Sequence, residues 1–96
     1  MVVGIARIEL YFPYPNSLKE KRQILRALTQ KIEANFKRIS IAEVDGHDFW
    51  QKAVLGISLV GKDREFVDSR LTTIIEFIKK ISDLEIIKVE IDLIGY

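Results

Sequence analysis

The order in which the hydrophobic period changes along this chain is the feature that most limits its fold. In four segments apolar and polar residues alternate, which is the two-residue period of a strand with one covered face. In two segments apolar residues recur every three to four positions, the period of an amphipathic helix. The predicted strands are residues 2–12, 39–44, 49–60 and 85–94, and the predicted helices are residues 17–35 and 63–80.

Residues with known preferences for helix ends and turns mark the borders of these segments. Ser17, followed three residues later by Glu20, predicts a capping box at the start of the first helix. Asp63 is a favourable cap for the second helix. Asp45-Gly46 between two strand patterns predicts a hairpin turn, and Ser82-Asp83 predicts a turn before the last strand.

This order of elements predicts an α+β domain of the ferredoxin-like βαββαβ type, in which two split strand-helix-strand units share one antiparallel sheet. Right-handed crossovers give the four-stranded sheet the order 4-1-3-2 and place both helices on one face. Ninety-six residues suffice for one core, so residues 1–96 are predicted to form a single domain. We call the sheet face under the helices the covered face and the opposite one the open face. In the last strand the alternation places Ile86 on the open face, and on the covered face it places Ile87, Val89, Ile91 and Leu93.

The composition excludes several kinds of protein. A hydrophobic share of 48% and a charged share of 30% are those of an ordinary globular protein. The absence of cysteine excludes a disulfide framework, a thiolate metal site and a thiol nucleophile. The first residues show no basic segment before an apolar core, and no apolar run approaches the roughly 20 residues of a membrane span. We therefore expect a cytoplasmic protein with no membrane partner.

The net charge of +1 conceals an uneven distribution. Residues 1–38 hold eight Lys or Arg and three Glu, a net charge of +5, whereas residues 39–96 hold seven basic and eleven acidic residues, a net charge of −4. Such a division is found where one side of a protein faces nucleic acid. It is also found where the two halves pair with each other in the folded state, which is the interpretation we favour.

The start of the first predicted helix carries cations where a helix disfavours them. The N-terminal end of a helix bears about half a positive charge, so Lys19, Lys21 and Arg22 oppose the dipole. The spacing of Lys21 from Leu18 and Leu25 also places it within the apolar stripe. An anion is therefore expected close by.

The predicted topology offers two sources for that anion. It brings residues 17–22 and 42–51 to the same edge of the sheet. One source, which we favour, is intramolecular pairing with an acidic residue of the second segment: Glu43, Asp45 or Asp48. The other is a bound phosphate or a partner's carboxylate, held by these cations and by free backbone N–H groups.

Lys19, Arg22 and Arg26 are predicted to form one solvent-facing row, which we call the basic ridge. On a wheel of 100° per residue they fall at about 100°, 40° and 80°, whereas the apolar stripe centres near about 300°. Most such rows are a solvated helix face, but a row of cations also suits the backbone of a nucleic acid.

Residues that carry catalysis or bind metals are scarce. Asp45, His47 and Asp48 lie within one turn, which is a poor arrangement for a metal ion without a further ligand. His47 is the only histidine, and neither Ser17 nor Ser58 has a predicted histidine partner. We therefore expect no enzyme activity, no metal and no cofactor.

Three common uses of this fold are disfavoured by missing residues. RNA-recognition modules carry paired aromatics on their central strands, and the third strand, WQKAVLGISLV, does not match their pattern. An acylphosphatase-like enzyme needs a phosphate-binding loop with an arginine after the first strand, where this chain has FPYPNS. A metal chaperone of this fold uses a CxxC motif.

The sheet face opposite the helices is predicted to be of mixed charge and partly apolar, with Ile5, Tyr11, Trp50 and Val54 among its residues. A second copy of the chain would cover such a face, so a homodimer is an alternative to a nucleic-acid partner. Trp50 stacks either on a base or partner or on neighbouring aromatics of the same chain, and we favour the second.

Two motifs resemble a known family. SLKEKR, residues 17–22, follows the first strand, and the pattern AEVD-x-x-D-x-WQ-x-A-x-LG covers residues 42–56. Together they closely resemble the YlxP-like bacterial family, a domain of unknown function, and the resemblance spans essentially the whole chain. The family pattern is matched at Asp45, Asp48, Trp50, Gln51 and Gly56.

The resemblance implies a ferredoxin-like fold and carries over no catalytic residue. It also implies a link to translation, because genes of this family often lie beside those of a translation initiation factor and a ribosome-binding factor. We therefore expect a non-catalytic accessory factor that contacts ribosomal RNA or a ribosome-associated protein. The hypothetical binding residues are Lys19, Lys21, Arg22, Arg26, Asp45, Asp48, Trp50 and Gln51.

Overall fold

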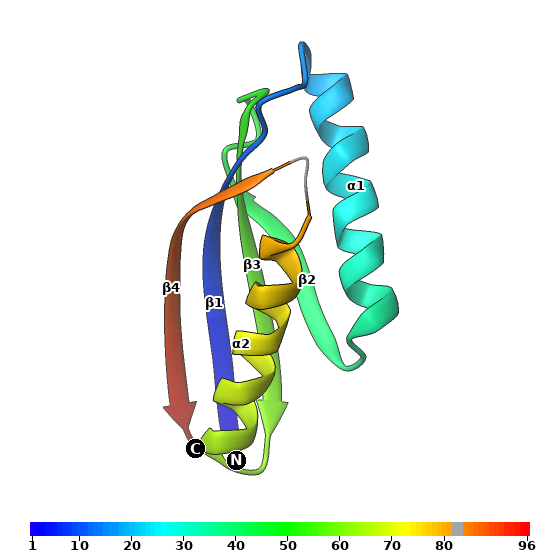
Figure 1. The fold of residues 1–96 in the computed structure, drawn as a ribbon. Coiled ribbons are helices and arrows are strands. Elements are labelled where there is room, and N and C mark those ends of the chain that lie inside the picture. Colours follow the sequence, from blue (N-terminus) through cyan, green and yellow to red (C-terminus); the bar gives the residue numbers. More distant parts are fainter. Residues whose placement is uncertain (82–83) are drawn as a thin grey trace.

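The computed structural model describes residues 1–81 and 84–96, and it confirms the predicted order of elements (Figure 1). The strands are β1 (Val2–Tyr11), β2 (Ile39–Asp45), β3 (Lys52–Gly61) and β4 (Glu85–Gly95), and the helices are α1 (Leu18–Asn35) and α2 (Arg64–Lys79). β3 begins three residues later than predicted, because Phe49, Trp50 and Gln51 belong to the hairpin loop. The predicted turn at Ser82-Asp83 lies outside the described residues.

The sheet is antiparallel throughout and has the order β2-β3-β1-β4, which is the predicted order counted from the other edge. Figure 1 shows both helices on the same face. Alternate residues of the two central strands meet under the helices, as where Ile8 pairs with Leu55 and both are fully buried. Burial of these apolar side chains is the main source of the fold's stability. No helix in the described part of the chain is long and apolar enough to cross a membrane.

Both helices begin at the predicted cap residues. The hydroxyl of Ser17 accepts a hydrogen bond from the backbone N–H of Glu20 at 3.1 Å, and Oδ1 of Asp63 accepts one from the N–H of Phe66 at 2.9 Å. The capping box differs in one detail, because the Glu20 carboxylate accepts from the N–H of Asn16 at 2.6 Å rather than from that of Ser17. The pair of bonds still fixes the entry into α1.

The predicted face assignment in β4 is wrong at Ile86 and Ile87. Glu9 of β1 pairs with Lys88, but the next residue, Leu10, pairs with Ile86, so β4 contains an extra residue at Ile87. This β-bulge reverses the alternation beyond it. Ile86 therefore packs against the core, and Ile87 lies on the open face with 54% of its surface exposed. Val89 and Leu93 pack against the core as predicted, while Ile91 is more exposed.

Candidate nucleic-acid interface

The two distinctive sequence segments lie next to each other, as the topology predicted. Nζ of Lys21 donates a hydrogen bond to the backbone oxygen of Gly46 at 2.6 Å, which joins the start of α1 to the β2–β3 loop. The backbone N–H of Phe12 donates a hydrogen bond to the backbone oxygen of Gln51 at 2.8 Å. The side-chain Nε2 of Gln51 donates to the backbone oxygen of Pro13 at 3.4 Å. The β1–α1 loop, the start of α1 and the β2–β3 loop are thereby held together at one end of the sheet (Figure 1).

The anion expected beside Lys21 is Glu43. Lys21 is only 1% exposed, and its Nζ lies 2.8 Å from Oε2 of Glu43, whose side chain is 17% exposed. No hydrogen bond is aligned onto that buried oxygen within the described residues, so the contact is chiefly a charge attraction. His47 approaches the other oxygen of Glu43 at 4.0 Å. The intramolecular alternative therefore holds for Lys21, which belongs to the interior and not to an exposed contact surface.

Asp45 neutralises a different cation. A bulge between Glu43 and Asp45 turns the Asp45 carboxylate onto the open face of the sheet, 3.6 Å from the guanidinium of Arg7. Arg7 also lies 3.5 Å from Glu9 and 3.4 Å from Glu90. Asp45 additionally accepts a hydrogen bond from the N–H of Gly46, whose φ of 79° favours glycine. These contacts make Asp45 a residue of the turn and of the open-face charge network.

Asp48 is exposed, and within residues 1–81 and 84–96 it forms no ion pair. The same part of the chain contains no group of three His, Cys, Asp or Glu side chains placed to share a metal ion.

The basic ridge is exposed as predicted. Lys19, Arg22 and Arg26 all face solvent, and none of their side chains forms an ion pair or hydrogen bond with the described residues. Arg22 and Arg26 line a shallow groove of about 350 Å³ between α1 and the outer strand β2. Glu33 and Glu43 also line it, so the groove is mixed in charge while the ridge above it is wholly basic.

Trp50 lies on the opposite side of the sheet from the ridge. With 52% of its surface exposed, it lines a hollow of about 470 Å³ together with Tyr11, Phe49 and Ile87. Tyr11 and Ile87 belong to the open face, whereas α1 covers the other face. The structure therefore places Trp50 and Tyr11 around one hollow but does not unite Trp50 with the ridge in one surface.

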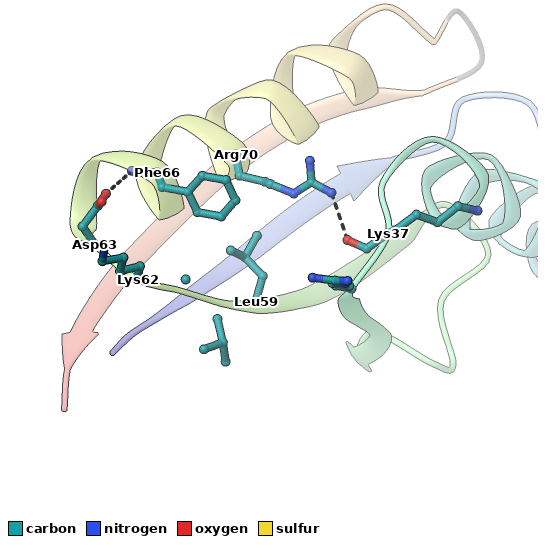
Figure 2. A pocket seen from close by; sticks show the side chains of 9 residues that line it. Lys37, Leu59, Lys62, Asp63, Phe66 and Arg70 are labelled. Carbon is teal, nitrogen blue, oxygen red and sulfur yellow. Dashed lines mark hydrogen bonds between the residues drawn. The ribbon is translucent and has the colours of Figure 1, made fainter.

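A second basic region, at the other end of α1, was not identified from the sequence. A hollow of about 650 Å³ lies between the end of α1, the end of β3 and the start of α2 (Figure 2). Four cations line it, together with the carboxylate of Asp63 and the ring of Phe66: Lys37, Arg38, Lys62 and Arg70. The signal was available, because the predicted topology already places the ends of the first helix and third strand beside the start of the second helix.

Comparisons with known proteins agree with the fold and the motifs. The family model described as "Protein of unknown function (DUF503)" matches residues 3–91. The chain is 30% identical over 84 residues to "Uncharacterized protein YlxP" of Bacillus subtilis (strain 168), and the match covers 88% of this chain and 90% of the relative. It is also similar in fold to "De novo designed protein Foldit4", with a TM-score of 0.51, 16% identity, and coverage of 99% of this chain and 97% of the other. The chain thus belongs to the DUF503 family of proteins of unknown function.

Proposed function

We propose that this protein is a non-catalytic accessory factor that binds ribosomal RNA through the basic ridge of α1. The observation that carries the proposal is the contrast between two sets of cations at the start of α1. Lys21 is buried and paired with Glu43, whereas Lys19, Arg22 and Arg26 are exposed and lack a partner in the described part of the chain. Cations that the fold itself does not neutralise are available to phosphate groups.

The geometry of the ridge suits a phosphate backbone. Residues four apart on a helix lie about 6 Å apart along its axis, so Arg22 and Arg26 are spaced like neighbouring phosphates of one strand. Lys19 extends the row by a further turn towards the start of α1, where the helix dipole also favours an anion. The resemblance to the YlxP-like family, with its translation-related gene neighbours, supports ribosomal RNA as the partner.

Co-sedimentation with purified ribosomal subunits tests the proposal. We expect binding that weakens as salt rises, with a log–log slope between about −2 and −3, because each of three phosphate contacts contributes about −0.7 to −0.9. The triple variant Lys19→Glu, Arg22→Glu, Arg26→Glu should lose most of this binding. A matched control, Lys52→Glu, Lys80→Glu, Lys88→Glu, changes the net charge equally but leaves α1 untouched.

The control decides whether the ridge is the contact. Equal losses in the two triple variants would mean that net charge alone drives binding, and the ridge would lose its role. Absence of binding by the parent protein at low salt would overturn the proposal as a whole.

A second candidate function is protein interaction or homodimerisation through the open face of the sheet. The observation that favours it is the apolar hollow beside Trp50, which Tyr11, Phe49 and Ile87 also line. Large exposed aromatic residues of this kind are typical anchors of protein interfaces. Binding that persists at high salt and is lost in Trp50→Ala would favour this function over RNA binding.

A further inference from the structure

We propose that the basic hollow between α1, β3 and α2 binds a nucleotide, with the phosphate on Arg38 and Lys62 and the base against Phe66. The hollow lies beyond the C-terminal end of α1, whereas the basic ridge occupies the N-terminal half of the same helix. The inference therefore goes beyond the proposed function and does not depend on it.

Two of the four cations already have partners within the protein. Nζ of Lys37 donates a hydrogen bond to the backbone oxygen of Glu33, near the C-terminal end of α1, at 3.3 Å. Figure 2 shows the Lys37 side chain pointing away from Phe66. Arg70 donates a hydrogen bond to the oxygen of Lys37 at 2.9 Å, and its guanidinium lies 5.7 Å from the ring centroid of Phe36. These two side chains satisfy the end of the helix and form a wall of the hollow.

The other two cations are free to meet a ligand. In the part of the chain that the structure describes, the side chains of Arg38 and Lys62 form neither ion pairs nor hydrogen bonds. Asp63, the one carboxylate of the hollow, is already the cap of α2. The hollow thus has an excess of three positive charges, which a phosphate group would offset.

The backbone at Arg38 indicates that this cation is not placed there for the sake of the fold. Its φ is +60°, in the left-handed region, where glycine is the residue that costs least. Arg38 lies two residues beyond the C-cap Phe36, in the turn into β2, and left-handed turn positions favour glycine because the turn needs the backbone and not a side chain. A strained position occupied by an unpaired guanidinium is explained if the guanidinium has a ligand to bind.

Phe66 supplies an aromatic surface on the same hollow. It is 52% exposed, and Figure 2 shows its ring extending from α2 towards Leu59 of β3. A Cβ atom at Gly61 would lie 2.6 Å from Cδ2 of this ring, so the glycine gives the ring room to lie there. Exposed aromatic rings beside cations are the usual platform on which single bases stack.

The size and the chemistry together identify the ligand class. The volume of about 650 Å³ lies within the range of small-molecule sites, and it exceeds the need of a phosphate ion alone. A nucleotide offers both groups that the hollow can recognise, a phosphate and a flat base. It is either a free mononucleotide or the 5′-terminal nucleotide of an RNA strand, and the two differ only in whether the 3′ oxygen of the sugar is linked to a further nucleotide.

Titration of the ¹⁵N-labelled full chain with AMP tests the inference. We expect saturable shifts of the backbone N–H resonances of Arg38, Gly61 and Lys62, and affinities at least about tenfold weaker for adenosine and for inorganic phosphate, which each lack one recognised group. A 5′-phosphorylated tetranucleotide is the second arm. Tighter binding of AMP identifies a free nucleotide, and tighter binding of the tetranucleotide identifies a strand end.

Two variants remove the proposed phosphate contacts, and a third removes the stacking surface. Arg38→Gly should weaken AMP binding at least about fivefold without lowering Tm, because glycine suits the backbone there. Lys62→Gln should weaken AMP binding by a similar factor. Phe66→Leu should weaken AMP at least about fivefold and leave phosphate binding unchanged. The triple variant of the basic ridge and the control Lys80→Gln should bind AMP as the parent does.

Three outcomes would overturn the inference. The first is the absence of saturable shifts at these positions with AMP and with the tetranucleotide. The second is equal affinity for AMP and inorganic phosphate, which would contradict recognition of a base. The third is unchanged AMP affinity in Arg38→Gly and Lys62→Gln while both variants remain folded.

Discussion

Lys21 shows how a single side chain can look like part of a binding site and serve the fold. At its position in the first turn of α1, a positive charge opposes the helix dipole, and burial adds a desolvation penalty. Glu43 and the backbone oxygen of Gly46 offset both costs, because they lie 2.8 Å and 2.6 Å from the ammonium nitrogen. The pair also anchors the β2–β3 loop to α1, so Lys21 and Glu43 give the two motifs, residues 17–22 and 42–56, a structural role.

Breaking this pair from one side should destabilise the protein more than removing both charges. Lys21→Met leaves the Glu43 carboxylate, whose side chain is 17% exposed, without its lysine partner, so we expect the free energy of unfolding to fall by about 2–4 kcal/mol. Adding Glu43→Leu removes the orphaned charge opposite Leu55 and should restore part of that loss. Urea denaturation of the parent, the two single variants and the double variant measures the coupling. Losses that simply add would show that the two charges do not interact.

At the scale of single elements, the bulge in β4 makes a sharp distinction between two adjacent isoleucines. Ile86 packs against the core, and Ile87 is exposed on the open face. We expect Ile86→Ala to lower the free energy of unfolding by about 1–2 kcal/mol and Ile87→Ala to change it by less than about 0.5 kcal/mol. Denaturation of the two variants at low protein concentration provides the measurement, and each serves as the control for the other. The reverse order would contradict the register.

The same strand shows which features of the fold could be predicted from the sequence and which could not. The alternation identified all four strands, and the helical period identified both helices, because each element buries one face against a common core. The bulge at Ile87 could not be predicted in this way, because Ile86 and Ile87 are both apolar and only the pairing with β1 decides which of them faces the core. Face assignments on the far side of a bulge therefore need the pairing of the strands.

The candidate site, like the fold, could be predicted from the sequence only in part. The helical spacing of Lys19, Lys21, Arg22 and Arg26 separated one buried cation from three exposed ones. The choice of Glu43 over Asp45 depended on the bulge in β2, which sends the two carboxylates to opposite faces. Trp50 was assigned to a strand, and its place in the hairpin loop followed only from the later start of β3.

The whole molecule separates its charged and apolar surfaces. Both basic regions contain residues of α1 or of its C-terminal end. At the centre of the open face Arg7 is paired with three carboxylates of its own chain, so this cation needs no charged partner. Apolar side chains are exposed towards the two ends of this face, Ile5 and Val44 on one side and Trp50 and Ile87 on the other. This arrangement suits contact with a second, similar face.

The size of the open face limits how strong such a contact can be. Strands about 4.8 Å apart, about ten residues long and rising about 3.3 Å per residue give a four-stranded face of about 600 Å². Two such faces bury about 1,200 Å² in total, the lower bound of stable specific interfaces. We therefore expect a weak homodimer, with a dissociation constant in the micromolar range.

Sedimentation velocity over a range of concentrations tests this prediction. The protein should sediment as a monomer at about 1 µM and as a dimer at several hundred micromolar, and Trp50→Ala should shift the transition upwards at least about fivefold. Phe66→Ala is the matched control, because its ring is exposed to the same extent, 52%, but lies on the helical side of the molecule. A strict monomer at the highest concentration would leave the open face in water. The exposed Trp50 would then have to be explained by a partner other than a second copy of this chain.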